Sequence, residues 1–166
     1  MAAREGINLS LKNIMHLFKS EQNLPISINQ AWDFFSNPAN LMVLTHPKMK
    51  MKMESENGLN PIFKGKILKI SVTLFGFFPS TFLSEISEVQ APDFFIDTQL
   101  KGPFAFWQHK HLLTEIDGGT KITDEVTLKF PLGFIGVVAN YLFGKKYLEN
   151  VFKYRKKVLD ERFGVY

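Results

Sequence analysis

The sequence predicts an α+β fold, in which an antiparallel sheet packs against helices that flank it in the chain. Alternating apolar and polar residues repeat through the middle of the chain, over about residues 62–130. A short helical pattern precedes this region and a longer one follows it. Helices placed before and after a run of strands are typical of α+β proteins. With 166 residues, we expect one domain over 1–166.

The first elements are a strand and two short helices. Residues 14–19 alternate as a strand does. In LPISINQAWDFFSNPANLMVLTHP (24–47), apolar residues recur at helical spacing and Ser27 is a suitable N-cap. Pro38 would end the first helix and begin a second short one, and Pro47 closes the region.

The middle of the chain is rich in strands. KMKMKM (48–53) alternates strictly, which predicts a half-buried strand rather than a methionine metal site, because such a site needs converging ligands. A β-rich stretch follows, interrupted near Gly76 and Pro79. The remaining strands are expected within residues 92–102, 106–116 and 120–130.

A long helix is expected from Leu132 onward. Its apolar stripe covers about 30 residues, which is long for a globular helix, and Gly144 would kink it. Residues 145–162 contain seven basic and three acidic side chains, so this segment alone accounts for the formal net charge of +4. A charged helix face of this kind is usually solvated, so we expect no nucleic-acid partner, although transient contact with a membrane surface is compatible with it.

The composition excludes several classes of site. The chain has no cysteine, which removes disulfide scaffolds and cysteine-ligated zinc or iron–sulfur centres, and no cofactor is expected. The start has no secretory pattern, and the most apolar stretch (130–143) is too short and interrupted to span a bilayer, so a cytoplasmic protein is expected. The 17 phenylalanines must fill a core or line an apolar cavity.

Two histidines lie two residues apart in FWQHKHLLTEI, beside a tryptophan. The following Gly118-Gly119 is a strong hairpin signal. With these glycines as a two-residue loop, His111 pairs with Val126 and His109 with Leu128. A three-residue loop would slip the register and reverse the faces.

This pairing places a mainly apolar set on the inner face, because the opposite set is polar and should face water. Both histidines and Asp124 then point inward. The expected ligand-binding residues are Trp107, His109, His111, Leu113, Asp124, Val126, Leu128 and Phe130, with Val138 and Leu142 of the C-terminal helix.

Three roles suit an inward histidine pair beside a carboxylate. A catalytic zinc site needs a third protein ligand, for which Asp124, or less well His16, is available; we expect no metal. Acid–base catalysis would use His109 or His111 with Asp124. A polar patch on an apolar wall, orienting the head group of a ligand, is the commoner arrangement and the one we favour.

Asp97 and Gln99 are weaker candidates, since their facing depends on the next loop. A Gly102-Pro103 loop places Phe94, Ile96, Thr98 and Leu100 on the histidine face. A Lys101-Gly102-Pro103 loop places Phe95, Asp97 and Gln99 there instead. Apolar content favours the first arrangement.

In their order, LPISINQAWDFFSNPANLMVLTHP, SEISEVQAPDFFIDTQLKGPFAFWQHKHLL, GGTKITDEV and PLGFIGVVANYLFGKKYLENVFKYRKKVLDERFG resemble the START-like superfamily, also called helix-grip or SRPBCC, and its small stand-alone bacterial members in particular. The resemblance implies a curved antiparallel sheet of seven strands around a long C-terminal helix, with a deep apolar cavity. It implies ligand binding more directly than catalysis.

Two functions from different classes follow. The first is binding of a hydrophobic small molecule, such as a lipid, isoprenoid or polyketide-like compound, between the sheet and the C-terminal helix. The alternative is a cyclase or dehydratase that uses His109 or His111 with Asp124 as acid and base. The phenylalanine content, the inward tryptophan and the resemblance favour the binding protein over the enzyme.

Overall fold

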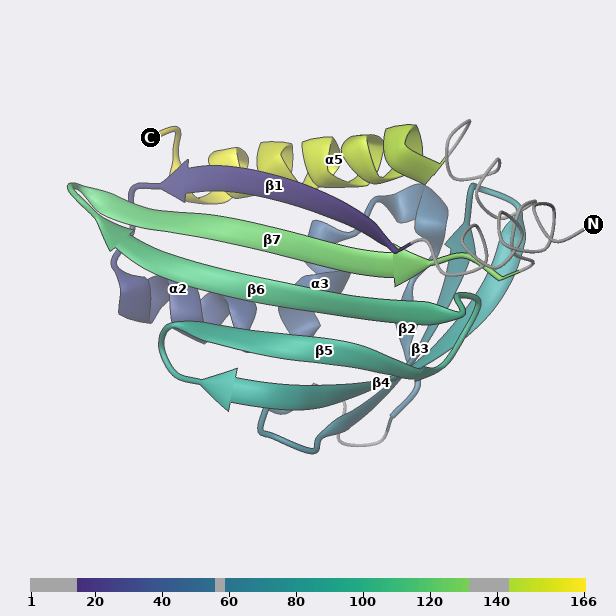
Figure 1. Cartoon of the computed structure of the whole chain (residues 1–166). Coiled ribbons are helices and arrows are strands. Elements are labelled where there is room, and N and C mark those ends of the chain that lie inside the picture. Colours follow the sequence, from purple (N-terminus) through teal and green to yellow (C-terminus); the bar gives the residue numbers. More distant parts are fainter. Residues whose placement is uncertain (1–14, 56–58, 132–143) are drawn as a thin grey trace, which may run out of the picture.

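The computed structural model describes residues 15–55, 59–131 and 144–166. Over these ranges the chain forms a seven-stranded antiparallel sheet with helices on its concave side, which confirms the predicted α+β class (Figure 1). The elements are β1 (His16–Leu24), α2 (Ile28–Phe35), α3 (Ala39–Leu44), η1 (Pro47–Met49), β2 (Lys52–Met53), β3 (Ile67–Leu74), β4 (Phe78–Gln90), β5 (Phe94–Lys101), β6 (Phe106–Ile116), β7 (Gly119–Lys129) and α5 (Lys145–Phe163).

The strand order is β1-β7-β6-β5-β4-β3-β2. Strands β2 to β7 therefore follow one another as a meander, and β1 returns to pair with β7 along nine residues. Every pairing is antiparallel, so short turns suffice between most neighbours. The sheet curves around α3 and α5, so its inner face is turned toward the C-terminal helix (Figure 1).

The first helix begins where its capping residue predicts. Ser27 Oγ accepts a hydrogen bond from Gln30 N, and Gln30 Oε1 accepts one from Ser27 N, which completes a capping box. Helix α2 buries Ala31, Phe34 and Phe35 against the sheet, and Pro38 precedes the first residue of α3. The expected pair of short helices is confirmed.

The strand expected over residues 48–53 is mostly wrong. Pro47 begins a single 3₁₀ turn, and the His46 ring nitrogen accepts a hydrogen bond from Lys48 N at 3.1 Å. Lys50 then has a φ of 46°, which interrupts any strand, and only Lys52–Met53 pair with β3. Local turn chemistry at Pro47 outweighs the alternating pattern.

The turn between β3 and β4 is located where the sequence predicts an interruption. Phe75 and Gly76 both have positive φ, at 54° and 82°, and together reverse the chain. Pro79 lies within β4, opposite Thr73, so the interruption is confined to the residues before Phe78.

The turn between β6 and β7 uses different residues from those expected. Ile116 pairs with Gly119, so the two-residue loop is Asp117-Gly118, with Gly118 at a φ of 73°. Gly119 is instead required by packing, because a Cβ there would lie 2.1 Å from the Leu24 carbonyl oxygen of β1. The predicted register is therefore wrong by two residues, a shift that keeps every side chain on its predicted face.

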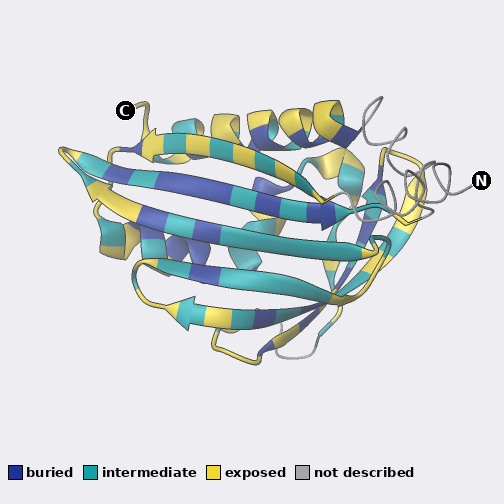
Figure 2. Cartoon of the chain, viewed as in Figure 1, coloured by how far each residue is buried: buried dark blue, intermediate teal, exposed yellow. Residues whose placement is uncertain are grey.

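Helix α5 lies over the inner face with a buried stripe at a spacing of four, three and four residues. Its members are Leu148, Phe152, Arg155 and Leu159. Gly144 directly precedes the helix, and the helical pattern expected over 132–143 lies outside the described residues. Figure 2 shows several dark blue buried positions along β7, and Val126 and Leu128 are among the buried residues of that strand. Within the described ranges, no helix is both long and apolar enough to cross a membrane.

Candidate functional site

A cavity of about 220 Å³ lies between the inner face of the sheet, α3 and α5. Most of its walls are apolar, so a ligand inside it would be largely removed from water. Its walls include Val72, Phe75, Phe82, Ser84, Phe95, Asp97, Trp107, His109, His111, Leu128, Phe130, Tyr147, Val151, Phe152 and Arg155.

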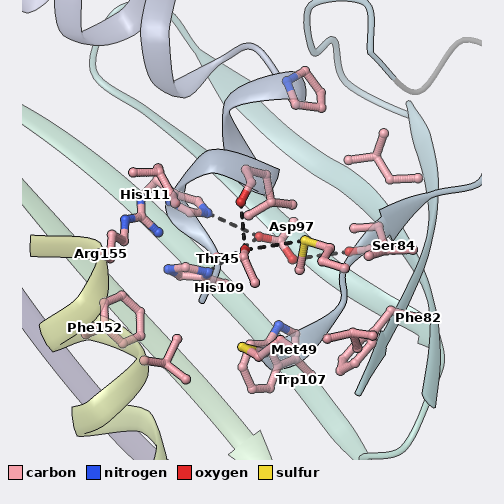
Figure 3. Close-up of a pocket in the computed structure, with 18 of the residues that line it drawn as sticks. Thr45, Met49, Phe82, Ser84, Asp97, Trp107, His109, His111, Phe152 and Arg155 are labelled. Atoms are coloured by element: carbon pink, nitrogen blue, oxygen red, sulfur yellow. Dashed lines mark hydrogen bonds and ion pairs between the residues drawn. The ribbon is translucent and has the colours of Figure 1, made fainter. Parts of the chain in front are cut away.

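One wall of this cavity is polar. Strand register places Asp97 of β5 opposite His109, and His111 opposite Asp124 of β7, so three neighbouring strands bring four titratable side chains together. Arg155 reaches the same point from α5 (Figure 3). We call these five residues the polar cluster.

The contacts within the polar cluster are short. His109 Nε2 lies 2.9 Å from Asp124 Oδ1, and His111 Nε2 lies 3.2 Å from Asp97 Oδ2. His111 Nδ1 lies 3.0 Å from Asp124 Oδ1, although its direction is not that of a hydrogen bond. Arg155 Nη2 is 3.4 Å from the same oxygen. Asp124 Oδ1 is thus the common anchor of both rings and the guanidinium.

Aromatic rings fix the two imidazoles from the sides. The ring of Phe95 stacks on His111 with centroids 4.2 Å apart, and the two histidine rings lie 3.7 Å apart. Phe152 of α5 meets His109 edge-on at 5.9 Å. These contacts leave the histidine rings little rotational freedom, so their nitrogens keep fixed directions.

Both carboxylates are held in the charged form. Burial alone would raise the pKa of Asp124, but the Arg155 guanidinium, the hydrogen bond from His109 and the close contact with His111 hold it well below its usual range. Burial likewise opposes ionisation of Asp97, yet its contacts with His111 and His109 lower its pKa. The Ser84 hydroxyl, 3.2 Å from Asp97 Oδ1, adds to this effect.

The two histidines have opposite shifts. Burial lowers the pKa of His109, and the charge of His111 lowers it further against the opposing attraction of Asp124. Burial also disfavours a charged His111, but its contacts with Asp124 and Asp97 outweigh this and raise its pKa. His111 therefore keeps its proton to higher pH than His109 does.

The structure places the expected binding residues in two groups. Trp107, His109, His111, Leu128 and Phe130 line the cavity, as their predicted face requires. Leu113 and Val126 are buried in hydrophobic clusters and Asp124 lies beneath the histidines, so these three do not reach the wall. Val138 and Leu142 lie outside the described residues.

The loop favoured for β5 and β6 is wrong. Phe95 and Asp97 face the histidines, as in the alternative arrangement, and Asp97 lines the cavity. Pairing of these strands ends at Thr98 and Gln108, so the connection is wider than a tight turn, and apolar content of β5 does not decide its facing. Gln99 shares this face but donates to the Phe104 carbonyl oxygen at 2.8 Å and does not line the cavity.

Sequence reasoning missed Arg155 and Ser84. Arg155 appears among seven basic residues of the last helix, where a solvated role is the ordinary expectation. Its signal is its position three residues after Phe152 and four before Leu159, which places it within the apolar stripe. Ser84 has no comparable signal, because serine is common on either face of a strand.

The comparisons with known proteins agree with this architecture. A family model described as "Domain of unknown function (DUF8410)" matches residues 22–163, which include every member of the polar cluster. The chain belongs to the DUF8410 family. No curated protein matches this DUF8410 chain.

Solved structures similar to the DUF8410 chain have the START-like, helix-grip fold, which confirms the fold that the sequence segments indicate. A START superfamily protein from Mycobacterium smegmatis is 14% identical, with 89% of this chain and 97% of that one covered and a TM-score of 0.65. A Thermus thermophilus protein is 14% identical, with coverage of 89% and 99% and a TM-score of 0.64. Ara h 8.0201 is 18% identical, with coverage of 88% and 98% and a TM-score of 0.61.

Proposed function

We propose that this protein binds a hydrophobic small molecule, such as a lipid, isoprenoid or polyketide-like compound, in the cavity between the sheet and α5. The observation that supports this most directly is an apolar cavity with one polar wall. Ligand sites are typically concave and apolar, with a few polar groups that fix orientation. The START-like fold of the DUF8410 family is compatible with the same use.

The dimensions suit a ligand with one polar end. A volume of about 220 Å³ equals that of roughly seven water molecules at about 30 Å³ each. The ligand's apolar body would contact Val72, Phe82 and Leu128, and its hydrogen-bonding group would meet Asp97 or His109. A wholly apolar ligand would leave the polar wall without a partner, which costs binding free energy.

Native mass spectrometry of freshly purified protein, followed by solvent extraction, tests the proposal. We expect a bound apolar molecule, or stoichiometric uptake of a dansylated fatty acid with a blue-shifted emission. Absence of both would count against binding.

A matched pair of valine substitutions makes this test specific. Val151 lines the cavity on α5, whereas Val165 is 80% exposed at the C-terminus. Val151→Trp should fill the cavity and abolish probe uptake, and Val165→Trp should leave uptake unchanged. Circular dichroism checks that both variants fold, since overpacking costs roughly 1–3 kcal/mol. Equal uptake by the two variants would place the probe elsewhere.

A second candidate function is acid–base catalysis of the cyclase or dehydratase type. The favouring observation is that His109 and His111 have pKa values shifted in opposite directions at one cavity wall, which is typical of an acid and base pair. Incubation of the extracted ligand with wild-type protein should then release water or give a cyclised isomer, and His109→Gln should stop this. An unchanged ligand would contradict catalysis while leaving binding intact.

Transient contact with a membrane surface would complement ligand loading. Phe75 of the β3–β4 turn lines the cavity, and its ring packs at a tilt against Tyr147 with centroids 4.4 Å apart, so this hairpin tip lies beside the cavity. The neighbouring Phe77 is 79% exposed, and Lys145 and Lys146 are exposed beside Tyr147. Aromatic rings flanked by lysines suit the surface of an anionic bilayer.

A further inference from the structure

The polar cluster arranges one nitrogen of each histidine toward Asp97. His111 Nε2 lies 3.2 Å and His109 Nδ1 lies 3.8 Å from the same oxygen, Asp97 Oδ2. One ligand-type atom from each of the three residues lies within 4.8 Å of the other two. The three residues come from β5 and β6, whose ladder fixes their spacing.

The other ring nitrogen of each histidine faces Asp124 instead of Asp97. His109 Nε2 donates to Asp124 Oδ1 at 2.9 Å, and His111 Nδ1 lies 3.0 Å from that oxygen. Asp124 is itself held by Arg155 at 3.4 Å. Metal-binding histidines commonly donate their second N–H to a carboxylate, which fixes the tautomer and the ring orientation. Asp124 does this for His109, and the same oxygen also lies in ion-pair contact with the ring of His111.

We propose that Asp97, His109 and His111 bind a divalent transition-metal ion through Asp97 Oδ2, His109 Nδ1 and His111 Nε2, with a remaining coordination position open to the cavity. Bonds of about 2.0–2.1 Å to a tetrahedral ion separate neighbouring ligand atoms by about 3.3 Å. The separations of 3.2 and 3.8 Å are therefore close to those of a bound site. Ser84 Oγ, on Asp97 Oδ1, leaves the other carboxylate oxygen directed at the histidines.

The charge balance of the cluster favours a cation. Asp97 and Asp124 contribute two negative charges and Arg155 one positive charge, all largely removed from water. With both rings neutral the cluster has one negative charge in excess, and an uncompensated buried charge is costly. A divalent ion reverses this excess, and an anionic ligand oxygen or hydroxide at the open position would balance it.

The donor set indicates which ions fit. Two imidazoles and one carboxylate are the ligands of many catalytic zinc centres and of non-haem iron(II) centres. Magnesium and calcium prefer oxygen ligands and are disfavoured by the imidazoles. The open position faces the proposed ligand cavity, so a bound ion would polarise a carbonyl or carboxylate oxygen of the ligand.

Calorimetric titration of chelator-treated protein with Zn²⁺ tests the site, and Co²⁺ absorption reports the coordination geometry. We expect one equivalent bound by wild-type protein and a loss of affinity above about 100-fold in Asp97→Asn, which keeps the side-chain shape. The matched control is His16→Gln, because His16 is outside the cluster, and it should bind as wild type does. Equal binding by wild type and Asp97→Asn, or no binding by wild type, would overturn the proposal.

A second measurement needs no variant and is independent of any ligand uptake. The chain has four histidines, whose ring nitrogens can be followed by ¹⁵N correlation spectra. Zn²⁺ should shift the Nδ1 signal of His109 and the Nε2 signal of His111, because Asp124 faces their other nitrogens. Shifts confined to His16 and His46 would exclude the site even if zinc binds.

Discussion

Asp124 has to find its hydrogen-bonding partners inside the protein, because its side chain is only 6% exposed. One of its oxygen atoms, Oδ1, contacts the side chains of His109, His111 and Arg155. A buried ion pair of this kind adds little net stability, since desolvation offsets most of the attraction. Removing one partner lowers stability much more, because the remaining buried charged or polar groups are then left without compensation.

Asp124→Ala should therefore destabilise the protein strongly. We expect a loss of roughly 3–5 kcal/mol in the free energy of unfolding, as for other broken buried pairs. Urea denaturation followed by tryptophan fluorescence measures this. The control is Asp33→Ala on the exposed side of α2, which should change stability by less than about 1 kcal/mol. Similar losses for both variants would mean that Asp124 contributes no more to stability than an exposed carboxylate does.

The histidines predict a stability maximum in metal-free protein. The charged form of His111 contributes stability that is fully present below its ordinary pKa of 6.5 and is lost as pH rises through its raised value. The neutral form of His109 contributes stability present above 6.5 that is lost as pH falls through its lowered pKa. Asp97 and Asp124 face both rings and stay charged over this range, and the positive charge of Arg155 acts on His111.

Thermal unfolding in the presence of a chelator, at a series of pH values, should consequently peak near pH 6.5. His111→Gln should remove the decline on the alkaline side, and His109→Gln the decline on the acid side. The slope of each profile is the informative quantity, because either substitution lowers the overall stability. Identical slopes in wild type and both variants would contradict the assignment of the two shifts.

At the scale of elements, the β3–β4 hairpin tip combines exposure with a position beside the cavity. Phe77→Ser should leave the free energy of unfolding within about 0.5 kcal/mol of wild type, because the ring is 79% exposed. Co-sedimentation with vesicles of phosphatidylcholine and phosphatidylglycerol should fall severalfold. Leu17→Ser, at a residue 68% exposed on β1, is the control and should sediment as wild type does. Equal loss in both variants would argue against a specific tip contact.

Most of the elements could be predicted from the sequence because their signals are local. Ser27 and Gln30 define the start of α2, and the inward face of β6 follows from period-two alternation. The register of β6 and β7 could not be obtained from the turn alone, because one of the two glycines serves a distant contact with Leu24. An even shift preserved the faces, so the error did not affect the site.

The polar cluster was harder to predict because it depends on contacts distant in sequence. Asp97 faces the histidines because the wide connection between β5 and β6 sets the register of these strands. The apolar content of β5 does not predict this register. Arg155 lies 31 residues after Asp124 in the chain, and only packing of α5 on the sheet joins them. The sequence therefore offers Asp124 or His16 as a third ligand beside His109 and His111, whereas the site proposed above uses Asp97.

For the whole molecule, the cavity lies at the junction of the sheet and α5 and is not within either. Leu148 and Phe152 pack on Val126 and Leu128, while Arg155 holds the helix through Asp124. A ligand enclosed there would contact both layers at once. Its binding free energy would then oppose separation of the helix from the sheet as well as global unfolding.

Hydrogen exchange can separate these two effects. A bound apolar ligand at about 100 times its Kd should add about 2.7 kcal/mol to global stability and raise the melting temperature by several degrees. In native-state exchange, amides of α5 should be slowed more than those of β7, because β7 is paired on both sides and already protected. Protection confined to β3 and β4 would instead indicate a ligand that rests near the hairpin tip without bridging the layers. Uniform protection would indicate global stabilisation alone. The difference in exchange protection between α5 and β7 therefore decides whether the helix must move to admit the ligand.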